Sequence, residues 1–176
     1  WDEFLKIHLK TLWACDFLSK KVMTLGGLVD YFMLFFIHVS TRRVYLGGIS
    51  ASPDAVWMAQ QARNFCMVAQ ETDPKPTILI RDRDGKFTPQ FDAIIKTEGI
   101  EVKRLPKGSP NLNAYIERWI QSFEVECLDH FLVFGVSHLD HIASQYLELY
   151  NALRPHQALD NEVLTGVKAP QDLEAQ

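Results

Sequence analysis

Three acidic residues stand at positions where a fold could bring them together to hold metal ions. Asp16 interrupts the apolar run WACDF, and Asp82 comes two residues after the apolar run ILI. Glu117 is separated from Asp82 by 34 residues and lies in a segment with helical spacing. A carboxylate inside an apolar strand is costly to bury unless it is paired or bound to a cation. Two acids at strands and one on a helix therefore predict a site for divalent metal ions.

The pattern of apolar residues predicts the elements that position these acids. Apolar or alternating runs predict five strands, over residues 11–18, 28–40, 44–49, 77–81 and 100–105. Helical spacing predicts helices over residues 1–10, 55–69, 87–97, 111–128 and 136–153. Strands joined by tight turns form an antiparallel meander, and strands separated by helices pair in parallel. We therefore expect an α/β fold, with a mixed five-stranded sheet and helices on both faces.

The ends of the first and fourth strands of such a sheet can be neighbours. Asp16 and Asp82 then face each other, and the helix that carries Glu117 crosses beside them. Asp84, in the same acidic stretch RDRDG, is the rival to Asp82. On the helical pattern alone, Glu117 also fits a solvated surface residue. The second helix is expected to begin with Ser52 as its N-cap.

The composition is that of an ordinary globular domain. The chain has 176 residues, of which 47% are apolar and 23% are charged, enough for one domain with a sizeable core. It has no run of 18 apolar residues, so no membrane span is predicted. Its three widely spaced cysteines favour reduced thiols in a cytoplasmic protein. The net charge of −4 argues mildly against nucleic acid as a partner. The chain begins at Trp1 rather than at Met, which predicts that it is a fragment of a longer protein.

Five separated motifs follow one another in the order of a known family. They are WACDF, FFIHVSTRRV, IRDRDGKF, SPNLNAYIERW and YNALRPHQAL. With these motifs the chain resembles the integrase catalytic core of bacterial insertion-sequence transposases, the enzymes related to retroviral integrases. The resemblance implies a ribonuclease H-like fold and a catalytic core over residues 1–160, followed by a C-terminal tail over residues 161–176.

The resemblance maps the acidic triad of the family onto Asp16, Asp82 and Glu117, and the spacing to Phe87 favours Asp82 over Asp84. It implies DNA cleavage and strand transfer in DNA integration: water frees a 3′ hydroxyl at an element end, and that hydroxyl attacks the target strand. Two Mg²⁺ or Mn²⁺ ions, about 3.5–4 Å apart, stabilise the attacking and leaving oxygens of such a displacement. Carboxylates are the ligands that these ions prefer. No organic cofactor is expected.

DNA, both at the element ends and at the target, is the partner that the resemblance implies, together with a homo-oligomer. We expect the protein to act in the bacterial cytoplasm and not at a membrane. A basic cluster suits phosphates, although solvated surface charge explains it equally well. This cluster consists of Lys103, Arg104 and Lys107. The residues that flank the triad glutamate and are expected to touch DNA are Asn111, Asn113 and Arg118.

The sequence departs from the family pattern at one position. Many relatives carry a lysine seven residues after the triad glutamate, where this chain has Glu124. An acid at that place repels phosphate, so the alternative function is a catalytically decayed relative that only binds DNA or its own kind. A nuclease of the ribonuclease H type is a weaker third reading, against which the last two motifs argue. The cysteine and histidines at 127, 130, 138 and 141 fit no usual zinc pattern.

Overall fold

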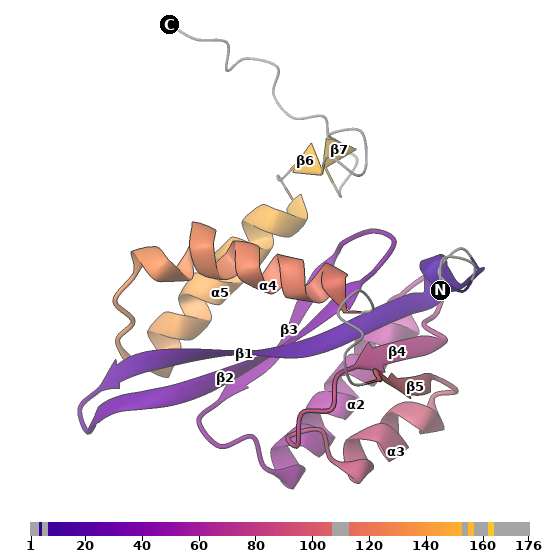
Figure 1. Ribbon diagram of the computed structural model, residues 1–176, viewed down its shortest axis with the longest axis horizontal. Helices are drawn as coiled ribbons and strands as arrows, with labels where there is room; N and C mark the ends of the chain where they lie inside the picture. Colours follow the sequence, from indigo (N-terminus) through magenta and orange to yellow (C-terminus); the bar gives the residue numbers. More distant parts are fainter. Residues whose placement is uncertain (1–3, 5–6, 107–112, 153–154, 157–161, 164–176) are drawn as a thin grey trace, which may run out of the picture.

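The centre of the molecule, described here from a computed structural model, is a five-stranded sheet (Figure 1). The structure describes residues 4, 7–106, 113–152, 155–156 and 162–163. The sheet strands are β1 (Leu12–Thr24), β2 (Gly27–His38), β3 (Val44–Ser50), β4 (Ile78–Arg81) and β5 (Glu101–Arg104). Their order is β3-β2-β1-β4-β5, with β1, β2 and β3 antiparallel and β1, β4 and β5 parallel. The predicted mixed sheet is confirmed, and the strand expected over residues 100–105 is its edge strand β5.

Helices cover both faces of the sheet, as predicted. The described helices are α2 (Ala55–Glu71), α3 (Pro89–Thr97), α4 (Ala114–Glu126) and α5 (Gly135–Ala152), with short 3-10 turns η1 (Leu9–Thr11) and η3 (Leu128–His130). Figure 1 shows α4 and α5 on one side of the sheet and α2 and α3 on the other. A small separate sheet pairs β6 (Pro155–His156) with β7 (Glu162–Val163).

The alternation of side chains along β1 sorts its residues between two cores, because successive residues of a strand point to opposite faces. Leu12, Ala14 and Leu18 belong to the core under α4 and α5. Trp13 and Cys15 belong to the core under α2 and α3. Asp16 lies an even number of residues from Leu12, Ala14 and Leu18, so its side chain points to the same face as theirs, the α4 side of the sheet.

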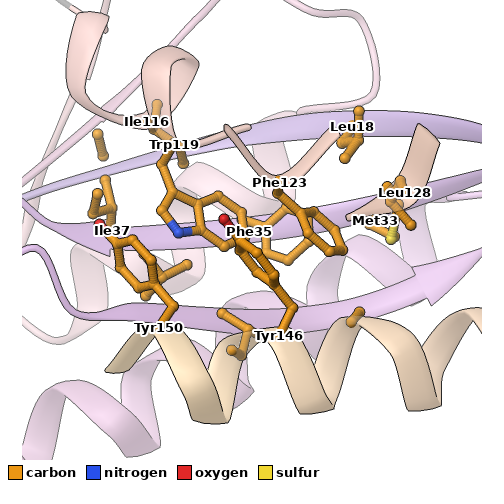
Figure 2. Close-up of a cluster of buried hydrophobic side chains, with 14 of the residues drawn as sticks. Leu18, Met33, Phe35, Ile37, Ile116, Trp119, Phe123, Leu128, Tyr146 and Tyr150 are labelled. Carbon is orange, nitrogen blue, oxygen red and sulfur yellow. The ribbon is translucent and has the colours of Figure 1, made fainter. Parts of the chain in front are cut away.

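Aromatic rings fix how α4 lies on the sheet (Figure 2). Trp119 and Phe123 of α4 contact Phe35 of β2 at ring-centroid distances of 4.6 and 5.8 Å. Tyr146 of α5 packs against Phe123 at 4.8 Å. All four side chains are buried. This packing sets the rotation of α4 about its axis, and with it the face on which the residues of its first turn stand.

The first strand is longer than expected. It continues to Thr24 instead of ending at residue 18, and it pairs with β2 from Trp13 to Thr24. Val22 is buried, whereas Lys21 and Met23 on either side are exposed. The period-two pattern of a strand therefore continues through this polar stretch. As a result, the β1–β2 hairpin extends well beyond the rest of the sheet (Figure 1).

The start of α2 also differs from the expectation. Asp54, not Ser52, is the N-cap: its carboxylate accepts a hydrogen bond of 2.8 Å from the backbone N–H of Trp57. Both residue types cap helices well, so composition alone did not choose between them. Val56, in the first turn of α2, is 78% exposed.

Candidate active site

The parallel ladder between β1 and β4 carries Asp16 and Asp82 to the same place. Cys15 is the register partner of Arg81 in this ladder, so Asp16 and Asp82 are the next residues on their two segments. Arg81 points to the α3 side, where it binds Asp92. By alternation, Asp82 turns to the opposite side, the one that Asp16 also faces.

The acid of the helix lies on this side too. Glu117 stands in the first turn of α4 with an exposed side chain, next to the buried Ile116. The pKa of Asp16 is raised from 3.8 to about 7, first of all by burial and then by the negative charges of Asp82, Glu117 and Asp84. A hydrogen bond from the backbone N–H of Phe17 opposes this rise. The acids are therefore close enough to act on one another electrostatically.

Asn113 joins the helix to the sheet at this place. It stands immediately before α4, and its side-chain amide donates a hydrogen bond of 3.0 Å to Oδ2 of Asp16. Because a carboxylate only accepts, this contact fixes which end of the Asn113 amide is nitrogen. The amide oxygen, Oδ1, is buried and has no hydrogen-bond partner among the described residues. An unpaired buried acceptor beside a carboxylate is a polar group that a ligand can satisfy.

A buried arginine holds the backbone of Asp82. The guanidinium of Arg81 is 2% exposed and donates two hydrogen bonds, of 2.8 and 2.7 Å, to the carboxylate of Asp92 on α3. A third, of 2.9 Å, goes to the backbone oxygen of Asp82. Arg104 of β5 donates to the same carboxylate at 2.8 Å. Burial alone would raise the pKa of Asp92, but the two arginines outweigh it and hold that pKa below its ordinary value.

Sequence reasoning missed this cluster of Arg81, Asp92 and Arg104. The signal was an arginine at the end of the apolar run ILI, because a guanidinium buried there needs a carboxylate partner. Asp92 lies in the first turn of α3, the element that follows the strand.

The rival acid, Asp84, has a different environment from Asp82. Its carboxylate forms an ion pair with Lys86 and accepts a hydrogen bond of 2.8 Å from the backbone N–H of the same residue. Asp82 accepts from the backbone N–H of Asp84 at 3.0 Å and makes no ion pair with a described residue. Asp84 is thus already neutralised by a lysine, whereas Asp82 is free to meet an added cation.

The donor atoms around Asp16 suit a hard divalent cation in their chemistry. They are carboxylate oxygens of Asp16, Asp82 and Glu117, with the unpaired amide oxygen of Asn113 nearby, and Mg²⁺ takes oxygen ligands of these kinds. Within the described ranges, no three His, Cys, Asp or Glu side chains are grouped closely enough to hold one ion as they stand. Coordination would therefore need these side chains to draw together.

The residues expected to bind DNA are found in unlike environments. Arg104 is half-exposed and bound to Asp92, and Lys103 lies 3.6 Å from Glu101 and over the ring of Phe4 at 4.6 Å. Arg118 is exposed on α4. Asn113 is 1% exposed, so the contact it makes is with Asp16 rather than with solvent. Two further expected residues, Lys107 and Asn111, lie outside the described residues.

Comparison with known proteins bears on the same region. The integrase core domain family matches residues 98–162, the part of the chain that holds Glu117. This part of the chain is similar to an integrase core domain. An uncharacterized 31.7 kDa protein of insertion element IS407 from Burkholderia multivorans is 30% identical over 86 residues. That match covers 48% of this chain but 31% of the relative, so the chain spans about a third of that protein's length.

The fold of this chain is similar to that of viral integrases. A chain of the simian T-cell lymphotropic virus intasome, solved with the PP2A regulatory subunit B56 gamma, matches with a TM-score of 0.71 over 94% of this chain and 56% of that one, at 11% identity. The HTLV-2 integrase catalytic core domain, solved in complex with magnesium in a trimeric form, gives 0.65 over 90% and 96%, at 13% identity. The predicted resemblance and the ribonuclease H-like fold are confirmed. None of the described helices has both the length and the apolar character needed to cross a membrane.

Proposed function

We propose that this integrase core catalyses metal-dependent cleavage and joining of DNA strands, with Asp16, Asp82 and Glu117 as its catalytic carboxylates. The observation that carries the proposal is the β1–β4 register, which takes Asp16 and Asp82 to one end of one face of the sheet. The raised pKa of Asp16 adds support, because its causes include the charges of Asp82 and Glu117. A cluster of acids of this kind gains from a cation that balances it.

Two divalent ions, Mg²⁺ or Mn²⁺, fit this donor set. Asp16 and Asp82 would hold one, and Asp16 and Glu117 the other. Bound there, the ions would stabilise the charge that develops on the attacking and leaving oxygens of a phosphodiester. The protein supplies the carboxylates and keeps them in place, Asp82 through the Arg81 contact to its backbone and Asp16 through the Asn113 contact.

The proposed chemistry has two displacements at phosphorus. In the first, water attacks a phosphodiester at an element end, the bond to the 3′ oxygen breaks, and a 3′ hydroxyl and a 5′ phosphate are left. In the second, that 3′ hydroxyl attacks a phosphodiester of the target, and the target strand's own 3′ oxygen leaves. Neither step forms a bond to the protein. The thiol of Cys15, beside the site, is fully buried, and burial raises its pKa well above the ordinary value, so it is no nucleophile.

Phosphate contacts would come from basic side chains around the acids. We assign this role to the exposed Arg118 and the half-exposed Arg104 first, and then to Lys103, Lys107 and Asn111. Asn113 would act mainly through Asp16. The core would span residues 1–160, act as a homo-oligomer on element ends and target DNA, and work in the bacterial cytoplasm.

The test is cleavage and joining of a branched DNA substrate, in which element end and target are already connected. Wild-type protein, Glu117→Gln and Glu124→Gln are compared with Mn²⁺ or Mg²⁺ and with a chelator. Glu124 lies two turns further along the same helix, so Glu124→Gln is a control of matched chemistry. We expect activity that chelator and Glu117→Gln abolish and that Glu124→Gln keeps or raises.

Two other results would contradict the proposal. No activity in the wild type, together with no binding of either metal, would favour the decayed relative that only binds DNA or itself. Equal activity of wild type and Glu117→Gln would show that the acid of the site lies elsewhere. Activity confined to a strand paired with RNA would favour the nuclease reading.

A further inference from the structure

Large apolar side chains gather without cover at the far end of the β1–β2 hairpin. The hairpin contributes exposed residues on both strands and in its turn. The connection between η3 and α5, together with the first turn of α5, contributes exposed residues beside it. We call this set the hairpin patch: Met23, Leu25, Leu28, Phe131, Leu132, Phe134 and Val136. Figure 1 shows this connection lying beside the hairpin, at the end of the sheet away from β4 and β5.

The two segments of the patch are held together by the backbone. The N–H of Met23 donates to the oxygen of Val133 at 2.8 Å, and Met23 forms a parallel bridge with Phe134. Two grooves meet at Met23: one of about 810 Å³ between the hairpin turn and the start of α5, and one of about 390 Å³ beside Leu132. The patch is thus a single surface with a ridge and two hollows.

The exposed area of the hairpin patch is large enough for a protein–protein interface. Leu25 is fully exposed, Leu132 is 74% exposed and Leu28 is 66% exposed. At roughly 150–200 Å² for each large side chain, the seven exposed fractions amount to on the order of 700 Å². The largest apolar patch on a typical monomer is about 300–600 Å². A stable interface takes about 800 Å² from each partner, so the patch has the size of one half of an interface.

The charges at the border of the patch indicate the partner. Lys20 pairs with Asp129 at 3.2 Å, and Lys21 pairs with Asp30 at 3.1 Å. These two pairs carry no net charge, so their lysines do not form the unpaired cluster of cations that the phosphates of DNA or of an anionic lipid surface need. A border with equal numbers of lysines and aspartates can pack against the same border of a second copy. A two-fold axis lets each lysine approach an aspartate of the other molecule.

We propose that the hairpin patch is the surface on which a second copy of this chain docks, in a two-fold symmetric dimer. The ridge of one copy would fill a groove of the other, since an isologous interface must be complementary to itself. The patch is remote from the proposed active site: Met23 lies seven residues beyond Asp16 on β1, or roughly 23 Å at the rise of a strand. The proposal therefore does not depend on the DNA chemistry.

The test is sedimentation velocity of the 176-residue chain over a wide concentration range. The variant Leu25→Asp/Leu132→Asp places charges at the two most exposed positions of the patch, so its melting temperature should stay close to that of the wild type. We expect the wild type to form dimers and the variant to self-associate at least about tenfold more weakly, which is a change of one decade in Kd. Met67→Asp, on α2 at 66% exposure, is the matched control and should leave the dimer unchanged.

Hydrogen exchange supplies a second readout that needs no variant. Amides of residues 23–28 and 131–136 should exchange more slowly at high than at low protein concentration. A wild type that stays monomeric would overturn the proposal, as would a dimer that Met67→Asp disrupts and the double variant does not. Protection of the same amides by added DNA in a monomer would assign the patch to DNA instead.

Discussion

The side-chain amide of Asn113 donates a hydrogen bond of 3.0 Å to Asp16, a residue 97 positions earlier in the chain. This contact ties the beginning of α4 to the middle of β1. Glu117 follows Asn113 by one helical turn, so the same contact governs how far that acid stands from the acids of the sheet. Asn113 is thereby a positioning residue for the proposed site.

Replacing Asn113 by Ala should loosen the site more than it loosens the fold. We expect about 1 kcal/mol of lost stability for a hydrogen bond, but a roughly tenfold or larger loss of DNA joining, because small displacements of catalytic groups are costly. The diagnostic readout is the Mn²⁺ concentration needed for half-maximal joining, which should rise. Asn64→Ala, which removes side-chain hydrogen bonds on α2, is the control. An unchanged metal requirement in Asn113→Ala would refute the positioning role.

Replacing Asp92 by Asn should strongly destabilise the protein. Arg81 is buried and has its charge balanced by Asp92, and removing one partner of a buried pair costs about 3–5 kcal/mol. Arg104→Ala, which removes the half-exposed arginine from the same carboxylate, should cost under about 1 kcal/mol. Urea denaturation of both variants measures the difference. Equal losses would mean that the burial of Arg81 does not matter to the fold.

Replacing Asp16 by Asn should raise stability when no divalent ion is present. The pKa of this carboxyl is about 7 in the folded protein against 3.8 ordinarily, so the folded state favours the protonated form. Ionising Asp16 in the folded protein lowers the free energy of unfolding. This loss is absent below about pH 4, grows between pH 4 and 7, and is complete above pH 7. We expect the variant to be more stable by on the order of 2–4 kcal/mol at pH 8, with no gain at pH 4. Thermal melts in chelator at both pH values test this, and an unaltered or lower melting temperature at pH 8 would contradict it.

Stability should also fall in mild acid because of His38. Its ring nitrogens contact the hydroxyl of Thr41 at 2.9 Å and the backbone oxygen of Lys10 at 2.8 Å, and the ring stacks on Trp13. Burial lowers the pKa of His38 from 6.5. The unfolded chain then takes up a proton before the folded one does, so this contribution is present above pH 6.5 and is lost as the pH falls below it.

The matched variant for this prediction is His38→Gln, which cannot take up a proton. The wild type should lose more stability than His38→Gln between pH 7.5 and 5.5, as measured by urea denaturation. Parallel losses in the two proteins would exclude His38 as the cause.

The sheet could be predicted from sequence because its strands have alternating or continuous apolar residues and are separated by turn residues or helices. The apolar runs, the turns and the helical spacing of residues 136–153 all agreed with one arrangement, and local patterns that agree in this way specify a fold. The end of β1 was not predicted, because its last residues are mostly polar and lie on an exposed hairpin. The start of α2 was not predicted, because Ser52 and Asp54 are both good capping residues.

The candidate site was predictable in part. The acids could be named from their places at strand ends and on a helix, but the partners that hold them depend on tertiary contacts. Nothing local tells that Asn113 turns inward to Asp16, or which carboxylate lies against the buried Arg81. Such contacts join residues that only the folded chain brings together.

Calorimetric titration with Mn²⁺ measures whether Asp16, Asp82 and Glu117 bind divalent cations together. The proteins to compare are the wild type, Asp16→Asn, Asp82→Asn, Glu117→Gln and, as the control, Asp84→Asn. We expect saturable binding to the wild type and to Asp84→Asn, and binding that is lost or at least about tenfold weaker in the other three. Equal binding by all five proteins, or loss with Asp84→Asn and not with Asp82→Asn, would contradict the assignment of the site.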